Sequence, residues 1–74
     1  MTRLSQAKTG AELIFISVGG GMGIVRRLTD MGLVPGEKIK VLHGSGQGQV
    51  TVSIKGSKIA LGYGIAQKIA VRLA

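Results

Sequence analysis

The chain has 74 residues, no cysteine and a formal net charge of +7. A chain of this length forms one small domain, here residues 1–74, and the lack of cysteine excludes both a disulfide staple and a thiolate metal site. Hydrophobic residues make up 45% of the sequence but aromatic residues only 3%, which predicts an aliphatic core. The positive charge favours an anionic partner, such as nucleic acid, an acidic protein or the inner face of a membrane. The alternative is that the scattered lysines have no partner and only keep the domain soluble.

The first quarter of the chain predicts a lead-in, a strand and a break. Leu4 to Gly10 carries no periodic pattern, whereas Glu12–Val18 is a short run of β-forming residues, as expected for a strand buried on much of both faces. Gly19 to Gly23 then interrupts regular structure. The N-terminus lacks the apolar segment of a signal peptide, and the longest apolar run, Leu13 to Ile16, is far shorter than the roughly 20 residues of a spanning helix. We therefore expect a cytoplasmic protein.

An amphipathic helix is predicted from about Ile24 to Met31. Ile24, Leu28 and Met31 recur at helical spacing and mark one apolar face. Gly32 follows at the position where a helix often needs a left-handed residue, which glycine adopts without steric cost. The helix is therefore expected to stop sharply at Gly32.

A tight turn is predicted directly after the helix, over Val34–Glu37. Pro35 and Gly36 occupy the second and third positions that a type II turn prefers for proline and glycine. The turn leads from the helix into the β-rich second half of the chain.

The second half alternates short strands with turns. The predicted strands are Lys38–Leu42, Gln49–Lys55, Lys58–Leu61 and Ile69–Leu73. A loop over Gly44–Gly48 and a tight turn at Gly56 separate the first three, and a turn with a single helical turn over Gly62–Lys68 precedes the last. The side chains expected to point inward are Val50, Val52, Ile54, Ile69, Val71 and Leu73. Five short strands with one inserted short helix predict a mainly β protein, a small partly open barrel, although the strand count alone also allows an OB-like barrel.

Two long segments carry a family resemblance. RRLTDMGLVPGEKIKVL followed by VSIKGSKIALGYGIAQKIAV resembles the FeoA family of bacterial and archaeal ferrous iron transport accessory proteins, over about Leu4 to Val71. The positions that match the family pattern are Arg27, Leu28, Met31, Gly32, Leu33, Pro35, Gly36, Ala60, Leu61, Gly62, Ala66, Ile69 and Val71. The resemblance implies an SH3-like barrel and a role in iron homeostasis, with transition metal ion binding as a family-level property. The chain also resembles the C-terminal module of DtxR-type iron-dependent repressors.

The sequence offers few residues for metal binding or catalysis. His43 is the only imidazole, and the three carboxylates, Glu12, Asp30 and Glu37, are widely separated. A structural zinc site needs four ligands and a catalytic one three, so His43 is only a weak candidate, and we expect neither a cofactor nor a specific ferrous iron site. No serine has a neighbouring base in the sequence, and we expect no enzymatic activity.

The glycine run before the helix and the positive charge raise two other possibilities. Gly23 is followed by Ile24, so the run lacks the Gly-Lys-Ser/Thr of a phosphate-binding loop. Loose anion binding at the helix start is physically possible, but a connection that lets the helix dock on the barrel explains the glycines better. Barrels that bind single strands stack bases on aromatic side chains, and Phe15 and Tyr63 are the only aromatics here.

The resemblance to the FeoA family implies a protein partner, the large FeoB-type membrane transporter of ferrous iron. We expect Arg26 and Arg27 to contact acidic groups of that partner, and Met31, Leu33 and Tyr63 to make apolar contacts. For Met31 and Leu33, packing in the core is an equal alternative. Two other functions stay open: an accessory domain acting on a metal-dependent transcriptional regulator, and a basic barrel that binds nucleic acid.

Overall fold

Six strands, two α-helices and one 3₁₀-helix make up the computed structural model, which describes residues 2–44 and 48–74. In chain order they are β1 (Thr2–Arg3), η1 (Leu4–Gln6), β2 (Glu12–Val18), α1 (Met22–Asp30), β3 (Lys38–His43), β4 (Val50–Ile54), β5 (Ser57–Leu61), α2 (Tyr63–Ala66) and β6 (Ile69–Leu73). Within the predicted loop Gly44–Gly48, residues 45–47 lie outside the described residues.

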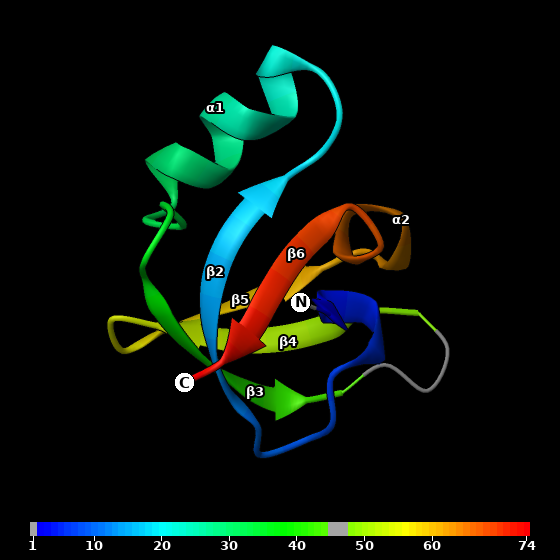
Figure 1. Cartoon of the computed structure of the whole chain (residues 1–74), viewed down its shortest axis with the longest axis vertical. Helices are drawn as coiled ribbons and strands as arrows, with labels where there is room; N and C mark the ends of the chain where they lie inside the picture. The colour runs from blue at the N-terminus through cyan, green and yellow to red at the C-terminus, as the bar shows by residue number, and fades with distance from the viewer. Residues whose placement is uncertain (1, 45–47) are drawn as a thin grey trace.

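The strands form one antiparallel sheet in the order β1-β6-β2-β3-β4-β5. The sheet curls around the core (Figure 1), while β1 and β5 lie at its two edges and do not pair with each other, so the barrel is open. Register shifts in β2, between Phe15 and Ser17, and in β3, between Val41 and His43, sharpen the bend. The predicted mainly β, partly open barrel with an inserted helix is confirmed. The strand number is six rather than five because Thr2 and Arg3 also pair with β6.

The core is aliphatic apart from one phenylalanine, as the composition predicts. Its buried members are Leu4, Leu13, Phe15, Leu28, Leu33, Ile39, Val41, Val50, Val52, Ile54, Leu61, Ala66, Ile69 and Val71. The inward direction predicted for β4 is confirmed, as it is for Ile69 and Val71. The prediction for Leu73 is wrong, since its side chain is 76% exposed. β6 runs past the end of the core, so its last apolar residue lies at the surface.

Helix α1 begins two residues earlier than the sequence indicates. Gly21 is its N-cap, with extended backbone, and both Met22 and Gly23 are helical. A glycine in the first turn of a helix reduces its stability without ending it, so the glycine run is only partly a break. Figure 1 shows α1 projecting from the end of β2, beyond the sheet. Leu28 is buried and Ile24 packs against the core, which anchors the helix by one face.

The turns on either side of β5 differ in what they require of the sequence. Lys55 (φ 51°) and Gly56 (φ 83°) form the two-residue β4–β5 turn with positive φ at both positions, which is type I′ geometry. The predicted turn at Gly56 is therefore confirmed. Gly62 precedes α2 with φ −63°, and a β-carbon there would meet no atom within 4 Å, so neither backbone nor space requires glycine.

Ala66, the last residue of α2, is fully buried. A larger side chain at this position would have to displace atoms of the core.

Candidate interaction surface

The C-terminus of α1 is fixed by a Schellman motif. The Leu33 amide donates to the Leu28 carbonyl over 2.9 Å, and the Gly32 amide donates to the Thr29 carbonyl over 2.9 Å. Gly32 has φ +95°, so the predicted left-handed glycine at the helix end is confirmed. Leu33 is only 2% exposed and lies in the core with Leu28. The expected partner contact of Leu33 is therefore wrong: the motif turns this side chain inward.

The turn after α1 is tied to the middle of β2. The Glu37 amide donates to the Val34 carbonyl over 2.9 Å and Gly36 has φ +92°, which confirms the type II turn with Pro35 at its second position. The Gly36 amide donates to the Phe15 carbonyl over 2.8 Å, and the Phe15 amide to the Glu37 carbonyl over 2.9 Å. These bonds set where α1 ends relative to the sheet and thereby position its exposed side chains.

The other predicted contact residues lie at the surface. Arg26 and Arg27 are exposed on α1, Met31 follows it with 36% of its side chain exposed, and Tyr63 on α2 is 45% exposed. Met31 keeps a right-handed helical backbone at the C-cap, so Ile24, Arg27 and Met31 continue one face of the helix.

Two exposed apolar side chains on α1 were missed by the sequence analysis. Met22 is 81% exposed and Val25 is 40% exposed. The sequence indicates a helix that starts only at Ile24, so Met22 falls outside it. Val25 lies within the predicted helix but about 100° around its axis from Ile24, outside the apolar face that the sequence marks.

Two hollows flank α1. One has a volume of about 170 Å³ and lies toward β2, lined in part by Val18, Val25 and Pro35. The other, the α1–α2 hollow, has a volume of about 250 Å³ and is lined by Gly23, Ile24, Arg27, Leu28 and Ile65. The two neighbouring arginines therefore differ in their surroundings, since Arg27 lines the α1–α2 hollow and Arg26 lines neither.

The glycines before α1 allow the helix to approach the rest of the domain closely. Gly20 has φ +114°, and a β-carbon there would lie 3.2 Å from Ile24 Cδ1 and 3.6 Å from Lys68 Cδ. The Gly19 amide donates to the Lys68 carbonyl over 2.8 Å, next to β6. These contacts agree with the interpretation of the glycine run as a close connection for docking the helix.

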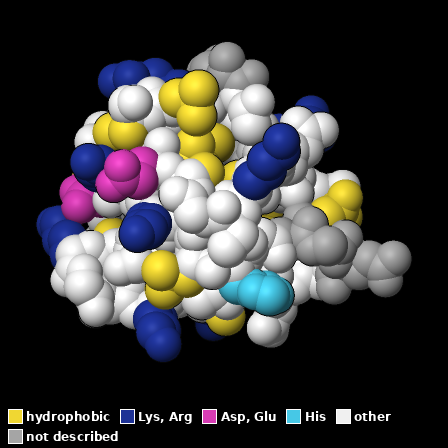
Figure 2. Space-filling model, turned by 90° about the horizontal axis from the view of Figure 1, so that it is seen from below, with side chains coloured by type: hydrophobic (Ala, Val, Ile, Leu, Met, Phe, Trp, Pro, Cys, Tyr) yellow, Lys and Arg dark blue, Asp and Glu magenta, His cyan; other side chains and the backbone are white. Residues whose placement is uncertain are grey.

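The residues considered for metal binding are dispersed. His43 is the last residue of β3 and lies at the surface, where it is the cyan side chain in Figure 2. Among residues 2–44 and 48–74, no three His, Cys, Asp or Glu side chains come together as a metal site would require. Glu12 is 3.7 Å from Lys38 Nζ, and Glu37 is 3.9 Å from Lys55 Nζ. Figure 2 also shows the basic side chains spread over this face.

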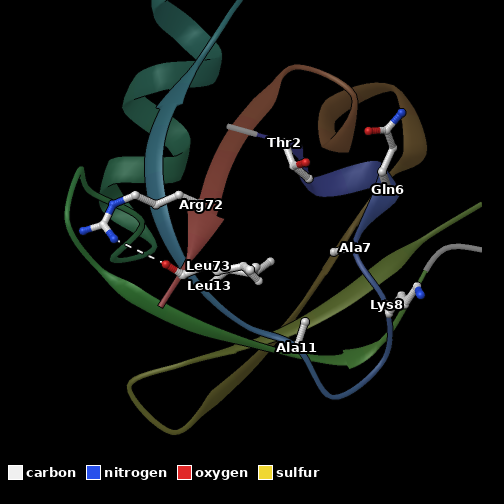
Figure 3. Close-up of a pocket in the computed structure, with 8 residues that line it drawn as sticks. All are labelled: Thr2, Gln6, Ala7, Lys8, Ala11, Leu13, Arg72 and Leu73. Atoms are coloured by element: carbon white, nitrogen blue, oxygen red, sulfur yellow. Dashed lines mark hydrogen bonds between the residues drawn. The ribbon is translucent and has the colours of Figure 1, made fainter.

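A third hollow, of about 460 Å³, lies between the N-terminal lead-in and the ends of β2 and β6 (Figure 3). Its lining residues are Thr2, Gln6, Ala7, Lys8, Ala11, Leu13, Arg72 and Leu73. The Arg72 guanidinium donates to the Leu73 carbonyl over 3.3 Å, and Figure 3 shows this side chain on the opposite side of the hollow from Lys8. This hollow is not predictable from the sequence, where the alternation of Ile69, Val71 and Leu73 places Leu73 inside the barrel.

None of the helices in the described part of the chain is long and apolar enough to cross a membrane.

Comparisons with known proteins agree on one family. The FeoA domain profile matches residues 2–73. Over 71 residues the chain is 44% identical to the "Putative Fe(2+) transport protein A" of Methanocaldococcus jannaschii, covering 96% of this chain and 85% of that protein. It is similar to a crystal structure of an iron uptake regulatory protein (FeoA), with a TM-score of 0.90 and 33% identity over 99% of this chain and 97% of the other.

A second group of solved structures shares the fold as part of a longer chain. A crystal structure of ScaR with bound Zn²⁺ has a TM-score of 0.87 and 25% identity. The match covers 100% of this chain and 37% of the ScaR chain. Another structure of ScaR is described as that of a manganese-activated repressor, so the expected similarity to a domain of metal-dependent repressors is seen in the fold.

Proposed function

Since this chain belongs to the FeoA domain family and has its SH3-like fold, we propose that it is an accessory protein of ferrous iron uptake that binds a FeoB-type membrane transporter. In this proposal the protein acts in the cytoplasm and reaches the membrane only through its partner. It regulates or assembles the transporter by protein–protein docking and catalyses no reaction itself.

The observation that carries the proposal is the surface formed by one face of α1 and by α2. Around the α1–α2 hollow it combines a half-buried isoleucine on each helix, Ile24 and Ile65, with the cationic Arg27. The proposal adds the exposed Met31, seven residues after Ile24 at the C-cap of α1, and the exposed Tyr63 on α2. We call these five residues the docking face. Protein interfaces concentrate their binding energy in a few apolar and arginine side chains of this kind.

A second candidate function is that of an accessory domain acting on a metal-dependent transcriptional regulator. The resemblance in fold to ScaR favours it. In that case the docking face would bind a DNA-binding protein instead of a membrane protein. A basic barrel that binds nucleic acid directly is the third candidate, and its single supporting feature is the net charge of +7.

Affinity capture from whole cells distinguishes the first two candidates. The tagged protein is incubated with a lysate that keeps both the soluble proteins and the detergent-solubilised membrane proteins, and the captured proteins are identified by mass spectrometry. We expect a FeoB-type transporter to be captured by the wild type and to be reduced with Tyr63→Ala, while Val25→Ala, an equally exposed apolar position outside the docking face, captures as the wild type does. Capture of a DNA-binding regulator with no transporter would overturn the proposal.

A further inference from the structure

We infer that the α1–α2 hollow receives one aliphatic side chain from a partner protein segment that carries carboxylates next to that side chain. The inference rests on the proposed function in so far as the transporter is taken as the source of the segment. Apolar complementarity, size and charge support it in turn.

The floor of the α1–α2 hollow is aliphatic and incompletely covered. Leu28 at its base is buried, whereas Ile24 and Ile65 are only partly buried although both pack against the core. Covering the open sides of two isoleucines would remove apolar surface from water, at roughly 25 cal/mol for each Å² covered. An aliphatic group in the hollow would therefore be stabilised.

The size of the hollow favours a side chain over a small-molecule ligand. Its volume is about 250 Å³, below the range of roughly 300–1,000 Å³ that is usual for small-molecule pockets. One of its lining residues, Arg27, is exposed, so the hollow reaches the surface and a longer chain can enter it with one residue and continue past the rim.

Among the described residues, the charged side chains that line the hollow and its neighbour are basic. Arg27 lines it directly. The side chains of Ile24 and Lys68 converge over Gly20, where an added β-carbon would lie 3.2 Å from the first and 3.6 Å from the second. A neighbouring hollow of about 420 Å³ shares Gly20 and Lys68 and adds Arg3.

No acidic side chain lines either of these two hollows in the described part of the chain. Asp30 is the one carboxylate on α1, and it stands at the last position of the helix. A segment whose aliphatic residue enters beside Ile24 would meet the positive charge of Arg27 in the hollow and that of Lys68 in the neighbouring one. Carboxylates next to that residue match this pattern, and electrostatic complementarity of this kind sets orientation and specificity.

No aromatic side chain among the described residues lines the α1–α2 hollow, which separates this occupant from a nucleic acid. Bases bind single-strand sites by stacking on aromatic rings. The lining residues are aliphatic apart from Arg27 and Gly23, which suits a leucine, isoleucine or valine side chain better than a base.

The adjacent arginines provide a matched test. Arg26→Glu and Arg27→Glu make the same change of charge one residue apart on α1, but only Arg27 lines the hollow. Binding to the purified FeoB-type transporter in lipid nanodiscs is measured for both variants at about 0.15 M salt, where long-range charge effects are screened beyond about 8 Å. We expect Arg27→Glu to weaken binding by about tenfold or more and Arg26→Glu by about twofold or less.

A second pair of variants, in which apolar side chains are shortened, controls for an effect of charge alone and for misfolding. Ile65→Ala shortens the hollow's wall, whereas Val25→Ala shortens an apolar side chain on the other side of α1. Ile65→Ala should weaken binding clearly more than Val25→Ala, with all four variants keeping the circular dichroism spectrum of the wild type. Equal effects within both pairs, with the transporter still bound, would overturn the hollow as the binding site and leave the proposed function intact.

A synthetic peptide tests the hollow independently of the transporter. Its leucine stands between glutamates, and in the control peptide glutamines replace the glutamates. We expect the glutamate peptide, but not the glutamine peptide, to shift the NMR amide signals of Ile24, Arg27 and Ile65. Such shifts without any transporter binding would support the hollow while refuting the proposed function. Absence of these shifts would overturn the inference. A lipid ligand would overturn it as well: in that case the wild type binds phosphatidylglycerol vesicles, Arg27→Glu loses this binding, and the peptide has no effect.

Discussion

A single methyl group at Gly32 tests how α1 is stopped. In Gly32→Ala the added β-carbon would lie 3.7 Å from Ile54 Cγ2, an ordinary van der Waals distance, so steric overlap with the core adds little. The penalty comes from the backbone, because φ at this residue is +95°. Left-handed conformations cost an L-residue about 1–2 kcal/mol, and the smaller entropy of the unfolded alanine chain opposes part of this by about 0.4–1 kcal/mol.

We therefore expect Gly32→Ala to lower the free energy of unfolding by about 1 kcal/mol, which corresponds to a fall in Tm of roughly 4–8 °C for a domain of this size. Thermal unfolding followed by circular dichroism measures the change. Gly23→Ala is the matched control, since Gly23 is helical and its β-carbon would meet nothing within 4 Å. Better helix propensity should make that variant more stable by about 0.5 kcal/mol. Equal or greater stability of Gly32→Ala would refute the assignment of Gly32 as the left-handed end of α1.

Three further outcomes follow from the structure. Leu33→Ala should lower the free energy of unfolding by about 2–5 kcal/mol because the side chain is 2% exposed, whereas Met31→Ala should lower it by less than about 1 kcal/mol; similar values in urea titrations would contradict the placement of Leu33 in the core. Lys55→Asn should raise stability by about 0.5 kcal/mol, because asparagine tolerates the φ of 51° at this type I′ turn and the 3.9 Å ion pair of the exposed Lys55 with the half-buried Glu37 contributes little; a fall in Tm would contradict this. Anaerobic calorimetry with ferrous iron should give no tight site for the isolated chain and the same weak heat with His43→Ala; one tight site per chain would show that the ligand set was underestimated.

The parts of the fold that local sequence determines were predictable. Glu12–Val18 and Ile69–Leu73 have the same bounds in the structure as in the prediction, because each is a continuous apolar or alternating run with a glycine or polar segment before it. The end of α1 was also predictable, since Gly32 and Pro35 each act through a conformational preference of their own residue. The start of α1 was not, because Gly21 caps the helix without a side-chain hydrogen bond that would mark it.

The surface features depend on contacts between distant residues. Leu73 continues the alternation of β6, but β6 runs past the end of the core before it reaches this residue, so the side chain is exposed. Leu33 likewise became a core residue through the hydrogen bonds that close α1. The α1–α2 hollow joins Ile24 to Ile65, which are far apart in the chain, and no local pattern reports such a pairing. The difference between Arg26 and Arg27 follows from the same packing.

Equilibrium binding of the purified protein to a FeoB-type transporter in nanodiscs, at low and at about 0.15 M salt, tests the proposed docking most directly. The proposal predicts saturable binding that persists at the higher salt and that weakens by more than about 1 kcal/mol when Met31 or Tyr63 is replaced by alanine. Binding to RNA or DNA should be weak and should fall steeply with salt. No detectable transporter binding, together with a nucleic-acid Kd below about 1 µM at the higher salt, would contradict it.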